Sequence, residues 1–255
     1  MIASLMMYNR PELAEAHDIY WNLIRRHLGA AGIASPATLS QSEDEFVVWK
    51  HPRLVLSQTC GMPYRLKLHG QVNLVGTPDF ALNNCPAGYY QSAIITHADN
   101  DGMCLESLKN SVFAYNQKIS QSGYAAIYAH TASRGFWFTQ QLQTHSHVQS
   151  ARAVADKRAS VAAIDAVTWR LIQQYEPFAA SLKLVEWTEP TPGLPYITAK
   201  TQDPEPVFNA VKAAITELPD DVKQTLGIVN LLKIPVAEYL GVPNPPQIRD
   251  GDTLL

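Results

Sequence analysis

The chain has 255 residues and a formal net charge of −3, with 46% hydrophobic and 17% charged residues. This length and apolar content suffice for one large or two small globular domains with a substantial core. Acidic and basic residues are interspersed, and no Lys and Arg run could neutralise a nucleic-acid backbone or an anionic membrane surface, so nucleic-acid binding is not expected.

The predicted elements begin at the N-terminus, where strands alternate with amphipathic helices as is typical of an α/β protein with largely parallel sheets. Ile2 to Met7 predicts the first strand, and a helix follows from Pro11 to Leu28 with Asn9 as its cap. Apolar residues at helical spacing along this helix, with His17 among them, are expected in the core.

The next predicted element is a short helix ending at Trp49, for which Ser42 and Glu45 resemble a capping box. A buried strand from Arg53 to Gln58 follows, and the turn from Thr59 to Tyr64 leads into another helix. Further strands are predicted at residues 72–76, 90–96 and 160–165, and further helices at 166–175, 204–218, 219–226 and 234–240.

Two stretches, Thr77 to Gly88 and Thr188 to Pro195, are dense in turn residues. Because they lie about a hundred residues apart, they suggest a segment inserted between two parts of another unit. The predicted organisation has one discontinuous lobe, residues 1–88 plus 189–255, and a second lobe, residues 89–188. Hinge crossings are expected near 77–89 and 187–195.

The cysteines and the N-terminal residues bear on the cellular compartment in which the protein is expected. Cys60, Cys85 and Cys104 are odd in number and form no CxxC pair, so neither a disulfide framework nor a cysteine zinc site is implied, although a single bridge stays open. No stretch approaches the ~20 apolar residues that span a bilayer, and residues 2–7 are too short for the apolar core of a secretory signal. As written, the sequence predicts a cytoplasmic chain or one already processed.

Two predicted helix starts are rich in hydroxyl and imidazole groups, namely Ser120 to Tyr124 and Thr144 to Ser150. The first turn of a helix presents unpaired N–H groups and a partial positive charge, so each is a candidate anion site. If the fold brings them together, they form a pocket for a small anionic solute.

Four motifs in order carry a resemblance to a known family. They are Ser120-x-Ser122-Gly123-Tyr124, Thr144-x-Ser146-His147-x-x-Ser150, the strand from Val161 to Asp165, and Thr188-x-Pro190-x-Pro192-Gly193-Leu194-Pro195. The chain resembles, over nearly its whole length, the phosphate, phosphite and phosphonate solute-binding proteins of ABC importers. The resemblance implies a two-lobe α/β periplasmic-binding-protein fold of type II with a ligand cleft between the lobes.

The same resemblance implies ligand binding without catalysis, in which the two lobes close around a small oxyanion such as phosphate, phosphite or phosphonate. It implies an ABC permease as partner and a periplasmic location, the latter at odds with the absent signal segment. No cofactor, catalytic residue or metal is expected, and the chain is expected to be a monomer.

The resemblance also implies the ligand-binding residues. They would be Ser120, Gln121, Ser122, Gly123, Tyr124, His147 and Asp165 in one lobe, with Tyr8, Cys60, Gly61 and Tyr64 in the other. Hydroxyls and backbone N–H groups would face the oxyanion, Gly123 would allow close backbone approach, and His147 would donate a hydrogen bond. Asp165 could accept from an amine or hydroxyl of the solute. Gln121 stands where phosphonate-binding relatives usually carry a small hydroxyl residue, so one direct phosphate contact could be lost.

Each of these residues also has a structural interpretation. Ser120 and Asp165 could cap helices, the tyrosines could be half-buried aromatics, and Cys60 could be an inert buried thiol. His145 and His147 suggest a metal pair but lack a third ligand. An alternative function also stays open: a cytoplasmic enzyme on the same fold, acting on a small carboxylate or phosphate-bearing metabolite, with Cys60, the two histidines and Asp165 as reactive groups.

Overall fold

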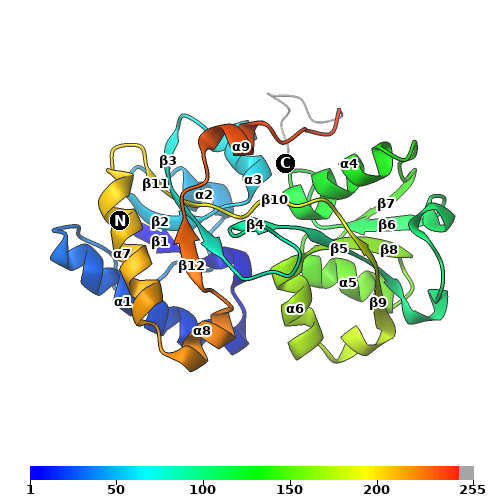
Figure 1. Cartoon of the computed structure of the whole chain (residues 1–255), viewed down its shortest axis with the longest axis horizontal. Helices are drawn as coiled ribbons and strands as arrows, with labels where there is room; N and C mark the ends of the chain where they lie inside the picture. The colour runs from blue at the N-terminus through cyan, green and yellow to red at the C-terminus, as the bar shows by residue number, and fades with distance from the viewer. Residues whose placement is uncertain (247–255) are drawn as a thin grey trace. The chain divides into compact units, whose positions relative to one another are not determined.

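The structure, a computed structural model, describes residues 1–246. The chain divides into two compact units, the first formed by Met1–Tyr89 and Pro192–Gly241, the second by Tyr90–Thr191 and the described residues from Val242. Each unit contains one five-stranded sheet flanked by helices, and the short strands β4 (Tyr89–Tyr90) and β10 (Thr191–Pro192) pair where the chain passes from one unit to the other (Figure 1).

The sheet of the first unit has the order β1-β2-β11-β3-β12. Its strands are β1 (Ile2–Ser4), β2 (Leu54–Gln58), β11 (Tyr196–Ala199), β3 (Val72–Asp79) and β12 (Asn230–Leu232). β1 and β2 run parallel, β11 runs antiparallel to both β2 and β3, and β12 runs antiparallel to β3.

Helices cover both faces of this sheet. Their bounds are α1 (Ala14–Ala30), α2 (Glu45–Trp49), α3 (Gly61–Pro63), α7 (Pro204–Glu217), α8 (Asp220–Leu226) and α9 (Val236–Leu240). α1 and α7 pack side by side. On β11, the Tyr196 hydroxyl meets Tyr20 of α1, whereas the next residue, Ile197, packs with Trp49 of α2 and Tyr239 of α9. Figure 1 shows α1 and α9 on opposite sides of this sheet.

The sheet of the second unit has the order β7-β6-β8-β5-β9. Its strands are β7 (Gln140–Gln143), β6 (Val112–Tyr115), β8 (Val161–Asp165), β5 (Ser92–His97) and β9 (Leu182–Trp187). β7, β6 and β8 run parallel, and β5 runs antiparallel to its neighbours β8 and β9. Helices α5 (His147–Ala155) and α6 (Ala166–Tyr175) lie on one side, and the run formed by the π-helical turn η6 (Gln121–Ala125) and α4 (Ala126–Ala132) lies on the other (Figure 1).

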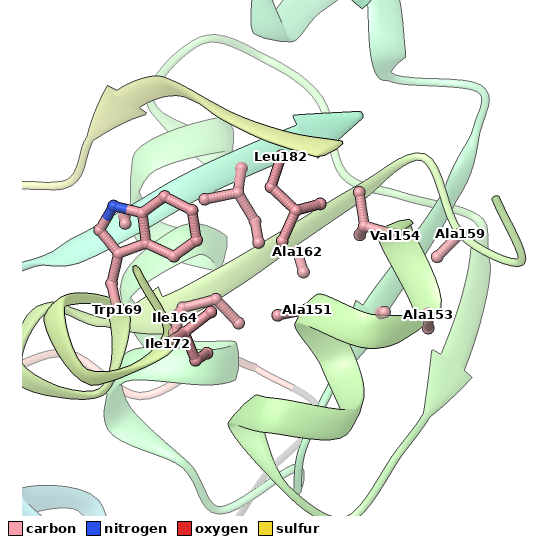
Figure 2. Packing of buried hydrophobic residues seen from close by; sticks show 12 residues of the cluster. Ala151, Ala153, Val154, Ala159, Ala162, Ile164, Trp169, Ile172 and Leu182 are labelled. Atoms are coloured by element: carbon pink, nitrogen blue, oxygen red, sulfur yellow. The ribbon is translucent and has the colours of Figure 1, made fainter. Parts of the chain in front are cut away.

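Small side chains let α5 approach this sheet closely. Figure 2 shows Ala151 of α5 beside Ala162 and Ile164 of β8, with Trp169 and Ile172 of α6 closing the cluster. These side chains are at most 4% exposed, so a larger residue at either alanine would overpack the layer. The opposite face of the sheet carries aromatic rings, including the Phe113–Phe138 and Tyr115–Tyr124 pairs.

Several predicted elements are confirmed and others are corrected. The strand β8 and the helix α6 have the expected bounds. The first strand is shorter than expected, and the 3-10 turn η1 (Met6–Tyr8) follows it. Arg10 rather than Asn9 is the N-cap residue of the turn η2 (Pro11–Leu13), which precedes α1. Asp44 rather than Ser42 caps α2, because its carboxylate reaches the N–H groups of Phe46 and Val47. The remaining turns are η3 (Tyr64–Leu68), a π-helical one, and the 3-10 turns η4 (Ala98–Asn100), η5 (Leu105–Leu108) and η7 (Pro177–Ser181).

Most strands of each sheet run in one direction, as expected, but both sheets are mixed. β11 and β12 run against β1, β2 and β3, and β5 runs against the other four strands of the second sheet. In each unit, the chain enters from the other unit and forms a strand, β5 or β11, that begins at the carboxyl edge of the parallel strands and runs antiparallel to them. Ser92, the first residue of β5, stands opposite Asp165, the last residue of β8. Tyr196, the first residue of β11, stands opposite Gln58, the last residue of β2. Among the described residues, no helix has the length and hydropathy needed to cross a membrane.

Candidate functional site

The candidate site lies at the carboxyl edge of the second unit's sheet, where three parallel strands end. Asn116 follows β6, Thr144 follows β7, and Asp165 is the last residue of β8. The loops after β6 and β7 are joined by hydrogen bonds from Thr144 N to Tyr115 O at 2.8 Å and from His145 N to Asn116 O at 3.0 Å. Open α/β sheets bind ligands at this edge, because loops and helix starts converge there.

Residues 120–123, here called the anion loop, begin the η6–α4 run. Ser120 Oγ caps the run by accepting from Gly123 N at 3.0 Å. The first intrahelical hydrogen bond, from Ala125 N to Ser120 O, spans five residues, so the N–H groups of Gln121 and Ser122 precede it. A π-turn of this kind is rare and is frequent at functional sites.

The second helix start meets the first through a side-chain hydrogen bond. Ser122 Oγ lies 2.9 Å from Nε2 of His147, the first residue of α5, and Ser146 caps that helix by accepting from Gln149 N. Burial lowers the pKa of His147 to about 4, although the backbone of Ala163 acts in the opposite direction. The imidazole is therefore neutral at pH 7.

The close packing around Gly123 leaves no space for a side chain. A Cβ built on Gly123 would lie 2.0 Å from Asn116 Oδ1 and 3.1 Å from His147 Cε1, so only glycine fits while both neighbours stay in place. Asn116 Oδ1 is itself buried without a hydrogen-bond partner in the described part of the chain. Asn116 is not among the predicted site residues, because the strand that it follows, β6, was not predicted from the sequence.

The remaining predicted residues of this unit are buried and have structural contacts. Asp165, 2% exposed, caps α6 by accepting from Thr168 N at 2.9 Å, as the structural interpretation expected. The Tyr124 ring packs edge-on against Tyr115 and Trp137, and burial raises the pKa of its hydroxyl. Gln121 is buried within the anion loop.

The four other predicted site residues belong to the first unit. Tyr8 makes an edge-on contact with Phe80 at 5.2 Å between ring centroids. Cys60 is buried and forms no disulfide, and Gly61 follows it after β2. Tyr64 packs edge-on against Tyr239 inside the hydrophobic core, and burial raises its pKa to about 12, which favours a structural role for this ring.

Metal ligation gains no support from the two histidines of the Thr144 to Ser150 segment. His145 is exposed, with a φ of 68° in the left-handed region, whereas His147 is turned toward Ser122. Across residues 1–246, no three His, Cys, Asp or Glu side chains come close enough to hold a metal ion.

Comparisons with known proteins give one family and many similar folds. A family model for the periplasmic substrate-binding proteins of phosphonate ABC transporters matches residues 72–234, and a comparison with curated proteins gives no match. PhnD1 of Prochlorococcus marinus in complex with methylphosphonate has a TM-score of 0.72 and 14% identity, covering 94% of each chain.

Two further structures support the same fold. A binding protein component of an ABC phosphonate transporter from Pseudomonas aeruginosa has a TM-score of 0.71 and 16% identity, covering 95% of this chain and 83% of that one. A Xanthomonas citri protein bound to ATP has a TM-score of 0.67 and 13% identity, covering 94% of each chain. The fold expectation is confirmed: the chain has the mixed α/β fold of two-lobe periplasmic binding proteins.

Proposed function

Because the chain belongs to the family of periplasmic substrate-binding proteins of phosphonate ABC transporters, we propose that it binds a small oxyanion such as phosphate, phosphite or phosphonate at its anion loop. Proteins of this family deliver a small solute to a permease partner. The observation that carries the proposal is the hydrogen bond between Ser122 and His147, which joins two helix starts beside Gly123.

The chemistry of the loop suits an oxyanion. Hydroxyl groups, N–H groups ahead of the first helical hydrogen bond, and the positive ends of two helices all favour negative charge. When the neutral His147 carries its proton on Nε2, it donates to Ser122 Oγ, and the serine hydroxyl hydrogen is then available to the anion. Each charge-assisted hydrogen bond would contribute roughly 1.5 to 3 kcal/mol.

The finer contacts are part of the proposal. Asp165 would accept from a hydroxyl or amine of the solute, which would favour a protonated or amine-bearing oxyanion over a fully ionised one. Contacts from Tyr8, Cys60, Gly61 and Tyr64 stay predictions from the family resemblance, as does a monomeric state.

Isothermal titration tests this function directly. The protein is titrated with phosphate, phosphite, methylphosphonate, sulfate and acetate, and saturable binding of at least one phosphorus oxyanion is expected. Ser122→Ala should weaken that binding by roughly 1 to 3 kcal/mol, or about 5- to 150-fold. The matched control is Ser133→Ala at the residue that ends the same helical run, whose hydroxyl donates to His130 O. A folded protein that binds none of these anions would contradict the proposal.

The enzyme alternative rests on the same hydrogen bond, since a serine within reach of a neutral histidine resembles a nucleophile and its base. Incubation with small phosphate esters followed by phosphorus NMR separates the two functions: turnover that Ser122→Ala abolishes would favour catalysis.

A further inference from the structure

A buried hydrogen-bond network connects the anion loop to the two segments where the chain enters and leaves the second unit. Ser92 begins β5, two residues after the unit's first residue, and Thr188 follows β9, three residues before Thr191. Both side chains are at most 3% exposed. Ser92 N donates to Thr188 Oγ1, and Thr188 N donates to Ser92 O, each at 3.0 Å.

The Ser92 hydroxyl reaches the anion loop. Ser92 Oγ donates to the carbonyl oxygen of Ser122 at 3.0 Å. That oxygen and the N–H of Gly123 belong to one peptide group, and this N–H donates to Ser120 Oγ. The Ser122–Gly123 peptide is therefore held at both ends by hydroxyl groups, one from a strand and one from the helix cap.

This double attachment fixes the orientation of the loop. Rotation of the Ser122–Gly123 peptide would break both hydrogen bonds, and each lost bond would leave a buried polar group unsatisfied. The same residue, Ser122, is bonded through its side chain to His147, so the position of its hydroxyl depends on the peptide being held. A binding site needs its contact groups held to within a fraction of an ångström.

We propose that Ser92 is a positioning residue for anion binding, which holds the Ser122–Gly123 peptide in its binding orientation and, through Thr188, links the anion loop to both connecting segments. The inference rests on the proposed function for its effect on affinity, whereas its effect on the loop backbone is independent of any ligand.

The test compares Ser92→Ala with a matched variant on the same strand. Thr96, fully buried near the other end of β5, donates through Oγ1 to Ser160 O at 2.7 Å and accepts from Asn100 Nδ2 at 2.9 Å. Thr96→Val therefore also removes a buried hydroxyl that donates to a carbonyl, away from the anion loop. Amide hydrogen exchange of residues 121–125 is measured without ligand, and methylphosphonate and phosphate affinities are measured by titration.

Ser92→Ala should speed exchange in residues 121–125 and weaken anion binding, each by about 3- to 10-fold, whereas Thr96→Val should change neither. Thr188→Val should act in the same direction as Ser92→Ala and serves as the second variant if Ser92→Ala does not fold. Equal exchange in Ser92→Ala and Thr96→Val would overturn the proposal, and so would faster exchange with unchanged affinity. If the unmodified protein binds neither anion, the proposed function fails, while the exchange result still decides whether Ser92 holds the loop.

Discussion

At the scale of single residues, the site depends on one contact between a glycine and an asparagine. The missing side chain at Gly123 leaves space for Asn116, which follows β6, and for His147, which begins α5. Asn116 lies seven residues before Gly123, and His147 lies 24 residues after it. The requirement for glycine therefore arises from the meeting of three segments, and the backbone conformation of Gly123 itself does not impose it.

Gly123→Ala should disturb the site by displacing the Asn116 side chain, because the new methyl group and Asn116 Oδ1 cannot share the same space. A stability loss of about 1 to 3 kcal/mol is expected in urea unfolding. Asn116→Ala removes the obstacle, so the double variant Gly123→Ala with Asn116→Ala should recover part of the loss. Additive effects of the two substitutions would mean that the methyl group clashes elsewhere.

At the scale of elements, α9 holds two distant segments of the first unit together. Its buried Tyr239 hydroxyl lies 2.5 Å from Thr77 Oγ1 of β3 and donates to Gly193 O at 3.0 Å. Gly193 N in turn donates to Gly88 O at 2.9 Å, an approach that a side chain at Gly193 would obstruct. A five-residue helix is marginal by itself, so its position depends on these tertiary contacts.

Tyr239→Phe should therefore destabilise the protein, because it keeps the ring contact with Tyr64 but leaves two buried groups without their partner. We expect a loss of about 1 to 3 kcal/mol in the free energy of unfolding, measured in urea. Tyr175→Phe, which removes an exposed hydroxyl bonded to Gln174, is the control and should change stability little. Equal effects of the two substitutions would show that the Tyr239 hydroxyl contributes nothing specific.

At the scale of the whole molecule, two histidines of the described residues, one in each unit, have a pKa lowered by burial. Burial lowers the pKa of His17 in α1 to about 4, although Asp18 acts in the opposite direction, and burial has the same effect on His147 in α5. The unfolded chain binds these protons near pH 6.5, and the folded chain binds them only near pH 4. Stability is therefore complete above pH 6.5 and falls as the pH drops toward 4.

Urea unfolding at pH 7.5 and pH 5.0 should reveal this loss, of the order of 1 to 3 kcal/mol for each histidine. His17→Gln and His147→Gln should each reduce the difference between the two pH values, since each removes one titrating group. The exposed carboxylates of Asp99 and Glu106 have lowered pKa values and titrate below this window. They are therefore not the source of the difference between the two pH values. A difference unchanged in both variants would assign the pH dependence to other groups.

The sequence by itself determined the features that short segments encode. The α/β alternation, the bounds of β8 and α6, and the two polar helix starts follow from local periodicity, capping and turn residues. The family motifs could also be identified in the sequence alone, and the match to the family model confirms the resemblance.

Only the tertiary structure decided which groups meet. Ser122 and His147 are 25 residues apart, Ser92 and Ser122 are 30 apart, and Ser92 and Thr188 are 96 apart. These contacts depend on strand order and on the antiparallel entry of β5, which local patterns do not encode, because the pairing of distant strands is fixed by the packing of the whole sheet. For the same reason the roles of Asn116 and Ser92 could not be recognised from the sequence, since their partners come from other strands and loops.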